Sequence, residues 1–391
     1  MRVLQINAVF GVGSTGVIVR DIHALLKERG VESFVAASSA KDGDKNVYII
    51  GSTLGKKLHA LLCRINGEQA YFSRFSTARL ISYIKKIKPD IVHLHNLHSN
   101  YINLPLLLRF LGKSDIKTVL TLHDCWFFTG GCFHYTAASC DRFKTGCGAC
   151  PKKRLDTPAY LFDRSAKIYG DRKRDFGKLK YLYPVGVSSW IAREAEKSIF
   201  KSVRTIHNGV DTEIFKSSKE RLFGDGFVIL GPATKWLKAE NREALEKLSE
   251  AFSEDKIVLF GSDRVEGLPS NVTTAAYTKS QKELAKIYSS ADVFVNCTRE
   301  DSLPTVNLEA ESSGVPVVTY SNTGATETVP DRELFAVSTG DIDALISKVK
   351  DIKAKGKGVY SETVRDYVKN EFEKEKNYEK YLELYNEIMA L

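Results

Sequence analysis

Short apolar runs alternate with amphipathic stretches along the whole chain. Runs of strand length occupy residues 1–10, 31–37, 90–95, 117–123, 226–231, 256–260, 292–296 and 315–320. Stretches with apolar residues at helical spacing lie between them, at residues 17–29, 77–88, 105–111, 242–252, 282–288 and 306–312. Because strands that alternate with helices build parallel βαβ units, the pattern predicts an α/β fold with two doubly wound parallel sheets.

Length and turn residues divide this pattern into two domains. The chain has 391 residues, and a domain typically holds about 150. The turn dipeptide Asn208-Gly209 lies between the two halves and suits a linker. We therefore expect a first domain over residues 1–207 and a second over residues 208–372. Residues 361–391 are charged and predicted to be helical throughout, and the part from about residue 373 is expected to pack back on the first domain.

Composition excludes two classes of protein. With 43% hydrophobic and 27% charged residues, the chain is unlike a disordered protein. It has no run of 18 apolar residues, which excludes a membrane-spanning helix. The predicted strand at residues 1–10 lacks the basic region and the cleavage site of a signal peptide. These features favour a cytoplasmic protein.

The net charge of +9 is distributed unevenly. Residues 1–200 carry +15 and residues 201–391 carry −6. Basic residues gather at Arg74–Lys88 and Lys152–Lys180, interleaved with Tyr, Phe and Ile. Such runs are often only a solvated face, but the interleaving favours a surface for anionic lipids on the inner face of the plasma membrane. No nucleic-acid-binding module is recognisable, so a nucleic-acid partner is not expected.

An acidic motif in the second half carries the clearest chemical signal. A predicted strand ends at Asn296, a loop carries Glu300-Asp301, and a helix that contains Glu309 follows. Free N–H groups at a helix start favour an anion such as a diphosphate, while carboxylates nearby can accept hydrogen bonds from hydroxyls. The alternative is that Glu309 is a solvated helix residue and Glu300-Asp301 a helix cap.

This motif, followed by Gly314-Val-Pro-Val-Val318, resembles that of the retaining glycosyltransferases of family four, in which seven residues separate two carboxylates. Asn208-Gly-Val-Asp211 followed by Phe215, and residues 284–295, are similar to further signatures of the same family. The resemblance covers nearly the whole chain. It implies the GT-B fold: two Rossmann-like domains that face a cleft, with a nucleoside diphosphate sugar held mainly by the second. It also implies that catalysis requires no cofactor or metal.

The resemblance assigns roles in the second domain. Glu309 would bind the donor ribose, and Asp301 (or Glu300, in a shifted register) the donor sugar. The loop amides of Ser302 and Leu303 would help to hold the sugar and phosphates. The family's basic pair, which stabilises the leaving diphosphate, is altered in this chain, and Lys235 and Lys238 are its best substitutes.

The first domain contributes a glycine-rich turn and several histidines. Gly11-Val-Gly-Ser-Thr-Gly16 joins a predicted strand to a helix; it is an ordinary βα turn on its own, but Gly16 resembles the glycine beside the donor diphosphate, with Ser14 and Thr15 on the acceptor side. His123 ends a predicted strand and matches the family's histidine that contacts the transferred sugar; a buried core histidine is the alternative. His95 and His98 are expected to line the cleft on the acceptor side.

Four cysteines form a separate cluster. Cys132, Cys140, Cys147 and Cys150 lie within 19 residues of a glycine-rich loop. In a cytosolic protein this spacing favours a structural zinc site, with four thiolate ligands and no open position for substrate. Free thiols, oxidised pairs and an iron–sulfur cluster are the alternatives. The surrounding sequence resembles a subset of family-four enzymes found in polysaccharide assembly.

We therefore expect a hexosyltransferase-type glycosyltransferase of surface polysaccharide synthesis. Its partners would be a nucleoside diphosphate sugar, a glycan or lipid-linked acceptor, and an anionic membrane surface. Two alternatives remain, a GT-B nucleotide-sugar epimerase and a non-catalytic glycan-binding or scaffold protein of the same pathway.

Overall fold

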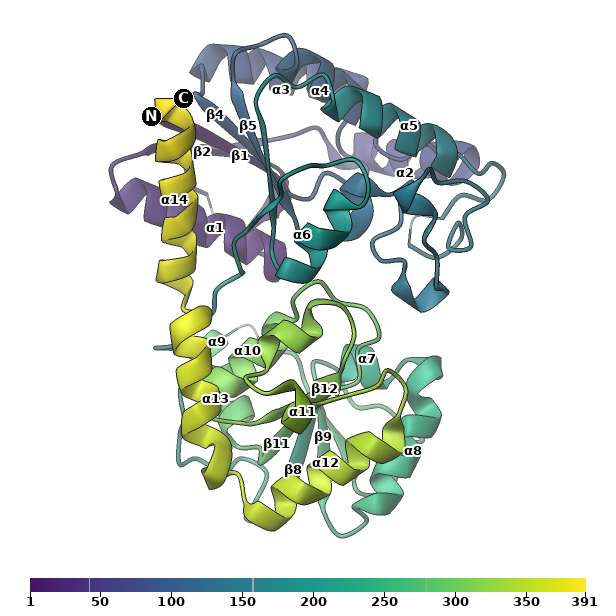
Figure 1. Cartoon of the computed structure of the whole chain (residues 1–391), viewed down its shortest axis with the longest axis vertical. Coiled ribbons are helices and arrows are strands. Elements are labelled where there is room, and N and C mark those ends of the chain that lie inside the picture. Colours follow the sequence, from purple (N-terminus) through teal and green to yellow (C-terminus); the bar gives the residue numbers. More distant parts are fainter. Residues whose placement is uncertain (42, 157, 279) are drawn as a thin grey trace. The chain divides into compact units, whose positions relative to one another are not determined.

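The computed structural model describes residues 1–391 except residues 42, 157 and 279. The chain forms two compact units, one of residues Met1–His207 with Tyr378–Leu391 and one of residues Asn208–Asn377 (Figure 1). Each unit contains one parallel sheet with helices around it. No helix in the described part of the chain is both long and apolar enough to cross a membrane.

The sheet of the first unit has seven strands in the order β3-β2-β1-β4-β5-β6-β7. The strands are β1 (Arg2–Phe10), β2 (Glu32–Ala40), β3 (Val47–Ile49), β4 (Ile91–Leu94), β5 (Lys117–Leu122), β6 (Leu182–Gly186) and β7 (Arg204–Thr205). The helices are α1 (Gly13–Glu28), α2 (Thr53–Asn66), α3 (Arg74–Ile87), α4 (Leu104–Leu111), α5 (Ser165–Phe176), α6 (Ser189–Glu196) and α14 (Lys374–Ala390). Short 3₁₀ turns cover Cys125–Phe128, Thr136–Ala138 and Arg142–Lys144.

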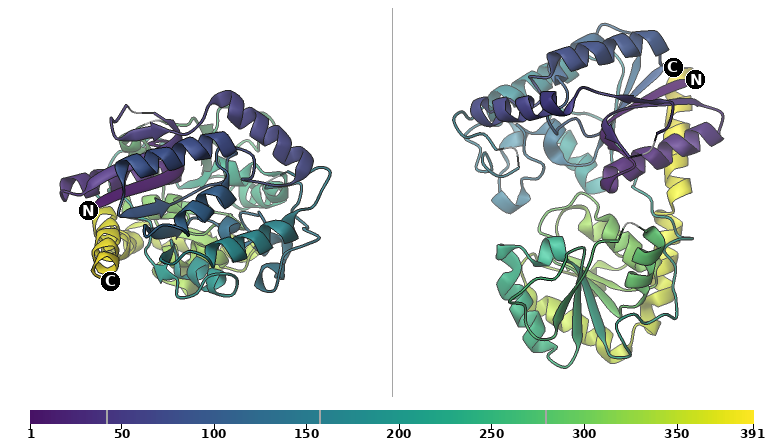
Figure 2. Two further views of the ribbon diagram at one scale, coloured as in Figure 1. Left: turned by 90° about the horizontal axis from the view of Figure 1, so that it is seen from above. Right: turned by 180° about the vertical axis from the view of Figure 1, so that it is seen from behind.

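The sheet of the second unit has six strands in the order β10-β9-β8-β11-β12-β13, and they are seen side by side in the view from behind (Figure 2). The strands are β8 (Val228–Pro232), β9 (Lys256–Phe260), β10 (Val272–Ala275), β11 (Val293–Asn296), β12 (Val317–Tyr320) and β13 (Ala336–Val337). The helices are α7 (Ala233–Trp236), α8 (Arg242–Ala251), α9 (Gln281–Ser289), α10 (Thr305–Ser312), α11 (Arg332–Phe335), α12 (Ile342–Lys355) and α13 (Gly358–Glu371), with 3₁₀ turns at Ala239–Asn241 and Thr323–Thr328.

Both sheets have a topological switch point. In the first, β1 pairs with both β2 and β4, and in the second, β8 pairs with both β9 and β11. The chain winds outward in opposite directions from these pairs, so the connections diverge and leave a crevice beyond the carboxyl ends of the strands. Ligands of doubly wound sheets bind at such points, and the two pairs therefore mark where a site is expected in each unit.

The C-terminal segment is two helices rather than the one predicted. α13 ends at Glu371 and α14 begins at Lys374. Between them the backbone pairs with Val210, whose N–H donates to the Phe372 carbonyl at 2.8 Å and whose carbonyl accepts from Lys374 at 3.0 Å. These bonds replace intrahelical ones, so the helix breaks where the chain meets residues that are distant in sequence. Gly209 permits the approach, because a Cβ there would lie 2.4 Å from the Lys374 Cα.

Helix α14 completes the core of the first unit, lying beside α1 (Figure 1). Two polar contacts fix its position on the sheet. The Tyr385 hydroxyl lies 2.6 Å from Nδ1 of His93, and the Tyr381 hydroxyl lies 3.0 Å from Oγ1 of Thr121. The shared apolar core consists of Val3, Ile18, Ile22, Leu25, Leu26, Ile91, Val119, Val185, Ile206, Tyr378, Tyr381, Leu384, Tyr385 and Ile388.

Candidate active site

The switch point of the second unit brings a lysine and a carboxylate together. Lys235 lies in α7 directly after β8, and Asp301 lies in the loop after β11, the neighbouring strand. Lys235 Nζ is 3.8 Å from Asp301 Oδ2, and both side chains are about one-third exposed. Lys238, the other predicted substitute for the family's basic pair, is exposed. Lys235 is therefore the better placed of the two to act with Asp301.

The loop that carries Asp301 is held in place by hydrogen bonds. Its Oδ1 accepts from the Leu303 N–H at 3.2 Å, and its own N–H donates to Thr323 Oγ1 at 3.2 Å. The Leu303 amide, predicted to hold the sugar or phosphates, is thus bonded to Asp301 in this structure. Ser302 is buried, and its hydroxyl has no hydrogen-bond partner among the described residues. An unpaired buried hydroxyl costs free energy because it has lost its hydrogen bonds to water. A ligand that pairs with the Ser302 hydroxyl would therefore gain a favourable hydrogen bond.

A buried chain of amides braces β11 against α10. Asn296 Nδ2 donates to Asn307 Oδ1 at 2.8 Å, and Asn307 Nδ2 donates to Thr328 Oγ1 at 2.9 Å. Asn296 also accepts from the Thr298 N–H through Oδ1 at 3.1 Å. Fully satisfied buried networks of this kind rigidify the segments they join, and here they fix the strand end, the loop and the helix that carry the acidic motif.

Glu309 lies in α10 and pairs with a tyrosine that the motif did not reveal. The Tyr288 hydroxyl of α9 donates to Glu309 Oε2 at 2.8 Å. Burial raises the pKa of Glu309 to about 7, and the bond from Tyr288 opposes that rise only in part. Glu311, two residues on, is fully buried with neither carboxyl oxygen bonded among the described residues, and burial raises its pKa well above the usual value. Glu309 is therefore the carboxylate of α10 that can accept hydrogen bonds from a ligand.

In the first unit, the glycine-rich turn places the start of α1 tightly against β1. A Cβ on Gly16 would lie 3.0 Å from Val9 Cγ2 and 3.3 Å from the Val9 carbonyl oxygen. The helix begins at Gly13, four residues earlier than predicted, so Ser14, Thr15 and Gly16 all lie in its first turn. Ser14 is exposed and Thr15 half-buried. A ligand that meets this helix start could thus reach the two hydroxyls.

The predicted histidines lie together at the carboxyl ends of β4 and β5. His95 Nδ1 is 3.1 Å from His123 Nε2, and His95 Nε2 is 3.2 Å from Gln5 Oε1 in β1. His98 Nε2 is 3.1 Å from Asp124 Oδ2, and that carboxylate is positioned in turn by the Trp126 N–H at 2.8 Å. Burial lowers the pKa of His95 well below its usual range and that of His123 to about 4. His95 and His123 are thus neutral at physiological pH.

The four cysteines of the predicted zinc site line one small cavity but are not a metal centre in this structure. No group of three or more His, Cys, Asp or Glu side chains within the described ranges is placed to hold a metal ion. Burial raises the pKa of Cys132 to about 12 and that of Cys147 to about 11, and Cys147 Sγ accepts a hydrogen bond from the Gly130 N–H at 3.1 Å. Because no such group is found among the described residues, the structure does not support the zinc prediction.

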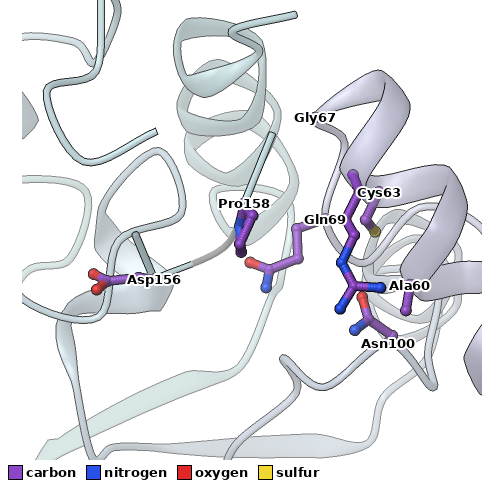
Figure 3. A pocket seen from close by; sticks show the side chains of 8 residues that line it. Ala60, Cys63, Gly67, Gln69, Asn100, Asp156 and Pro158 are labelled. Carbon is purple, nitrogen blue, oxygen red and sulfur yellow. The ribbon is translucent and has the colours of Figure 1, made fainter. Parts of the chain in front are cut away.

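A separate hollow lies at the end of α2, and Figure 3 shows its lining side chains. It measures about 90 Å³. None of the predicted site residues belongs to it, and it does not lie at the switch point of its sheet. It is lined by Ala60, Cys63, Arg64, Gly67, Gln69, Asn100, Asp156 and Pro158.

Three partners of the predicted site residues could not be recognised from the sequence motifs. Gln5, Asp124 and Tyr288 bond to predicted site residues from other elements. Only Gln5 leaves a signal in the sequence, as a polar residue between the apolar residues Leu4 and Ile6 of a predicted strand. The partnerships of Asp124 and Tyr288 depend on which elements are neighbours in the folded unit.

Comparisons with known proteins agree on one family. The family model described as Glycosyltransferase Family 4 matches residues 15–214, and the one described as Glycosyl transferases group 1 matches residues 233–354. The Escherichia coli (strain K12) protein assigned as colanic acid biosynthesis glycosyl transferase WcaC is 24% identical over 374 residues, which is 90% of each chain.

Solved structures share the fold across nearly the whole chain. Sucrose-phosphate synthase from Thermosynechococcus elongatus superposes with a TM-score of 0.70 at 17% identity, covering 100% of this chain and 99% of the other. WaaG, a glycosyltransferase involved in lipopolysaccharide biosynthesis, gives 0.68 at 14% identity, with 98% and 99% covered. Anabaena HepE in complex with UDP-glucose gives 0.65 at 13% identity, with 99% and 100% covered. These proteins confirm the predicted GT-B architecture.

Proposed function

Because the chain belongs to glycosyltransferase family 4, we propose that it is a retaining glycosyltransferase of surface polysaccharide synthesis. The donor is a nucleoside diphosphate sugar, and the acceptor is a glycan or a lipid-linked glycan. Similarity to the E. coli colanic acid protein supports the choice of pathway, and the HepE structure with UDP-glucose supports the class of donor.

The observation that carries this proposal is the pairing of Lys235 with Asp301 at the switch point of the second sheet. A lysine in this place can neutralise the charge that develops on a departing diphosphate. The Asp301 carboxylate can accept hydrogen bonds from sugar hydroxyls, and Glu309 can accept those of the ribose. The N-terminus of α10 adds a favourable potential for the phosphates.

The proposed reaction exchanges one bond at the anomeric carbon for another. The bond from this carbon to the diphosphate oxygen breaks, a bond to the acceptor oxygen forms on the same face, and the acceptor proton passes to the leaving phosphate oxygen. No step requires a protein base. In the first unit, His123 contacts the transferred sugar, Gly16 lies beside the diphosphate, and Ser14, Thr15, His95 and His98 serve the acceptor side.

A helix with an exposed apolar stripe supports binding to an anionic membrane surface. Leu54, Leu58, Leu61 and Ile65 recur at helical spacing along α2, and Leu54 and Leu58 are 77% and 56% exposed. The helix has no acidic residue and carries two lysines and an arginine. Apolar side chains flanked by cations are typical of helices that lie in a lipid interface.

The basic surface predicted from the sequence is only partly exposed. Lys152 pairs with Asp156 at 3.3 Å, and Arg172 packs on the Trp126 ring and donates to the Thr129 carbonyl at 2.8 Å. Both cations are buried. The lipid-facing surface we propose is therefore α2, together with the exposed Phe75 at the start of α3.

The test is nucleotide release from UDP- and GDP-sugars, measured with and without a lipid-linked glycan acceptor. We expect acceptor-dependent release that Glu309→Ala reduces strongly. Conversion of the donor to a second nucleotide sugar without acceptor would instead indicate an epimerase. Glycan binding without donor binding would indicate a non-catalytic protein, and unchanged kinetics in Glu309→Ala would refute the site.

A further inference from the structure

A chain of hydrogen bonds at the switch point of the first sheet ends on an unpaired acceptor. Gln5 lies in β1, His95 directly after β4, and His123 directly after β5, and these strands are neighbours in the sheet. The three side chains are joined in series by two bonds. Nδ1 of His123 is buried and has no hydrogen-bond partner among the residues that the structure describes.

The Val19 carbonyl determines which group donates and which accepts in each of these hydrogen bonds. Gln5 Nε2 donates to Val19 O at 3.3 Å. If the Gln5 amide were flipped, its Oε1 would face the Val19 carbonyl oxygen, and both atoms are acceptors. Gln5 Oε1 therefore faces His95 Nε2, 3.2 Å away. An amide oxygen can only accept, so Nε2 of His95 must carry the proton.

The protons of the two histidines follow from this bond. A neutral imidazole has one N–H and one acceptor nitrogen, so Nδ1 of His95 is an acceptor. It lies 3.1 Å from Nε2 of His123, which must then carry the proton and donate. The remaining nitrogen of His123, Nδ1, presents a lone pair. Burial lowers the pKa of both rings and keeps them neutral.

We propose that Gln5 and His95 are positioning residues that hold His123 in its Nε2–H tautomer, so that Nδ1 accepts a hydrogen bond from the donor-sugar hydroxyl that a hexuronate replaces with a carboxylate, and thereby selects a neutral sugar over a hexuronate. This proposal rests on the proposed function, in which His123 contacts the transferred sugar.

The selection follows from the number of protons available. At the position where the two sugars differ, the hydroxyl of the neutral sugar can donate to Nδ1, whereas the carboxylate of a hexuronate has no proton at neutral pH and would oppose the Nδ1 lone pair with its own. Protonation of His123 would remove this conflict, but burial opposes it. A site built to pair with a hydroxyl discriminates against analogues that leave its buried polar atom unpaired.

Long-range ¹H–¹⁵N spectra of the full-length protein labelled with ¹⁵N-histidine report the tautomer, and loss of signals in His123→Asn assigns them. At pH 7 we expect Nε2–H in the wild type and in Gln5→Glu, because a carboxyl that burial keeps neutral can donate to the Val19 carbonyl and accept from His95 as the amide does. Gln5→Met offers no acceptor and should give a mixture of tautomers. Tyr385→Phe removes a bond to His93 nearby and should keep the Nε2–H form. An Nδ1–H or charged His123 in the wild type, or no change in Gln5→Met, overturns the proposal.

Calorimetry on the same variants tests the selection. The probes are UDP-glucose against UDP-glucuronate and GDP-mannose against GDP-mannuronate. In any pair that binds, we expect the wild type to prefer the neutral sugar by about tenfold or more. Gln5→Met should narrow that preference and Gln5→Glu should retain it. Equal binding within a pair overturns the selection, whereas binding of none of the four probes refutes the proposed donor class, and the tautomer is still decided by the spectra.

Discussion

The Tyr288 hydroxyl donates a 2.8 Å hydrogen bond to Glu309, a carboxyl whose pKa burial raises from 4.5 to about 7. The folded protein therefore binds this proton more tightly than the unfolded chain does. Folding stability that depends on the proton is present below pH 4.5 and is lost as the pH rises toward 7.

Glu309→Gln should therefore stabilise the protein more at pH 8 than at pH 5. The amide stays neutral at both values and can still accept from Tyr288. At pH 8 the ionised Glu309 carboxylate lowers the free energy of unfolding of the wild type. Each kcal/mol of that loss should appear as a rise of about 2–4 °C in the Tm of the variant over the wild type. Thermal unfolding at the two pH values measures the difference, and an equal shift at both would show that Glu309 ionises normally.

Lys235 and Lys238 should differ in their effect on turnover. Lys235→Ala removes the cation beside Asp301 and should lower kcat about 100-fold, in the range for loss of one transition-state stabiliser. Lys238 is exposed, and Lys238→Ala should stay close to the wild-type rate. Steady-state nucleotide release compares the two, and an equal loss in both variants would contradict the assignment to Lys235.

Gly209 should tolerate no side chain. The Cβ of Gly209→Ala would overlap the backbone of Lys374 at 2.4 Å. We expect it to lower the free energy of unfolding by about 1–3 kcal/mol, as for other overpacked positions. Gly226→Ala is the matched control, since a Cβ there meets no atom within 4 Å. Urea denaturation of both variants measures the difference, and a neutral Gly209→Ala would show that the two segments separate freely.

Replacing an exposed leucine of α2 should weaken membrane binding. Leu58→Glu or Leu61→Glu removes an apolar side chain and adds a negative charge, and each should reduce partitioning into vesicles that contain phosphatidylglycerol about tenfold or more. Leu222→Glu, at an exposed leucine of the second unit, should bind like the wild type. Vesicle sedimentation provides the measurement. Unchanged binding of both α2 variants would exclude this helix as the lipid surface.

The sequence predicted the central strands of both sheets and the helices beside them, but it did not predict several further elements, among them α2, α5, β6, β10 and α12. β9 has the predicted bounds, and most other predicted strands and helices differ from the observed ones by a few residues at an end. His123 directly follows β5, and Asp301 lies in the loop between β11 and α10, so both stand where the local pattern predicted. The break at Phe372 was missed because it depends on pairing with Val210, far away in the chain.

The features of the site that the sequence did not predict depend on contacts between elements that are distant in the chain. The partnership of Gln5 with His95 requires that β1 and β4 be neighbours, which no local pattern specifies. The cysteine spacing likewise suggested zinc ligands, but spacing does not determine how the four side chains lie in the folded loop, and they form no group placed to hold a metal ion in the described part of the chain.

The packing of α14 has a consequence for the order in which the protein matures. The first unit takes Tyr381, Tyr385 and Ile388 into the same core as Val3 in its first strand. During synthesis, residues 1–207 therefore leave the ribosome without the helix that covers part of their sheet. The second unit is contiguous in the chain and can complete its core first, whereas the core of the first unit is incomplete until residues 378–391 emerge. A nascent chain stalled before that point should present an uncovered apolar face to chaperones.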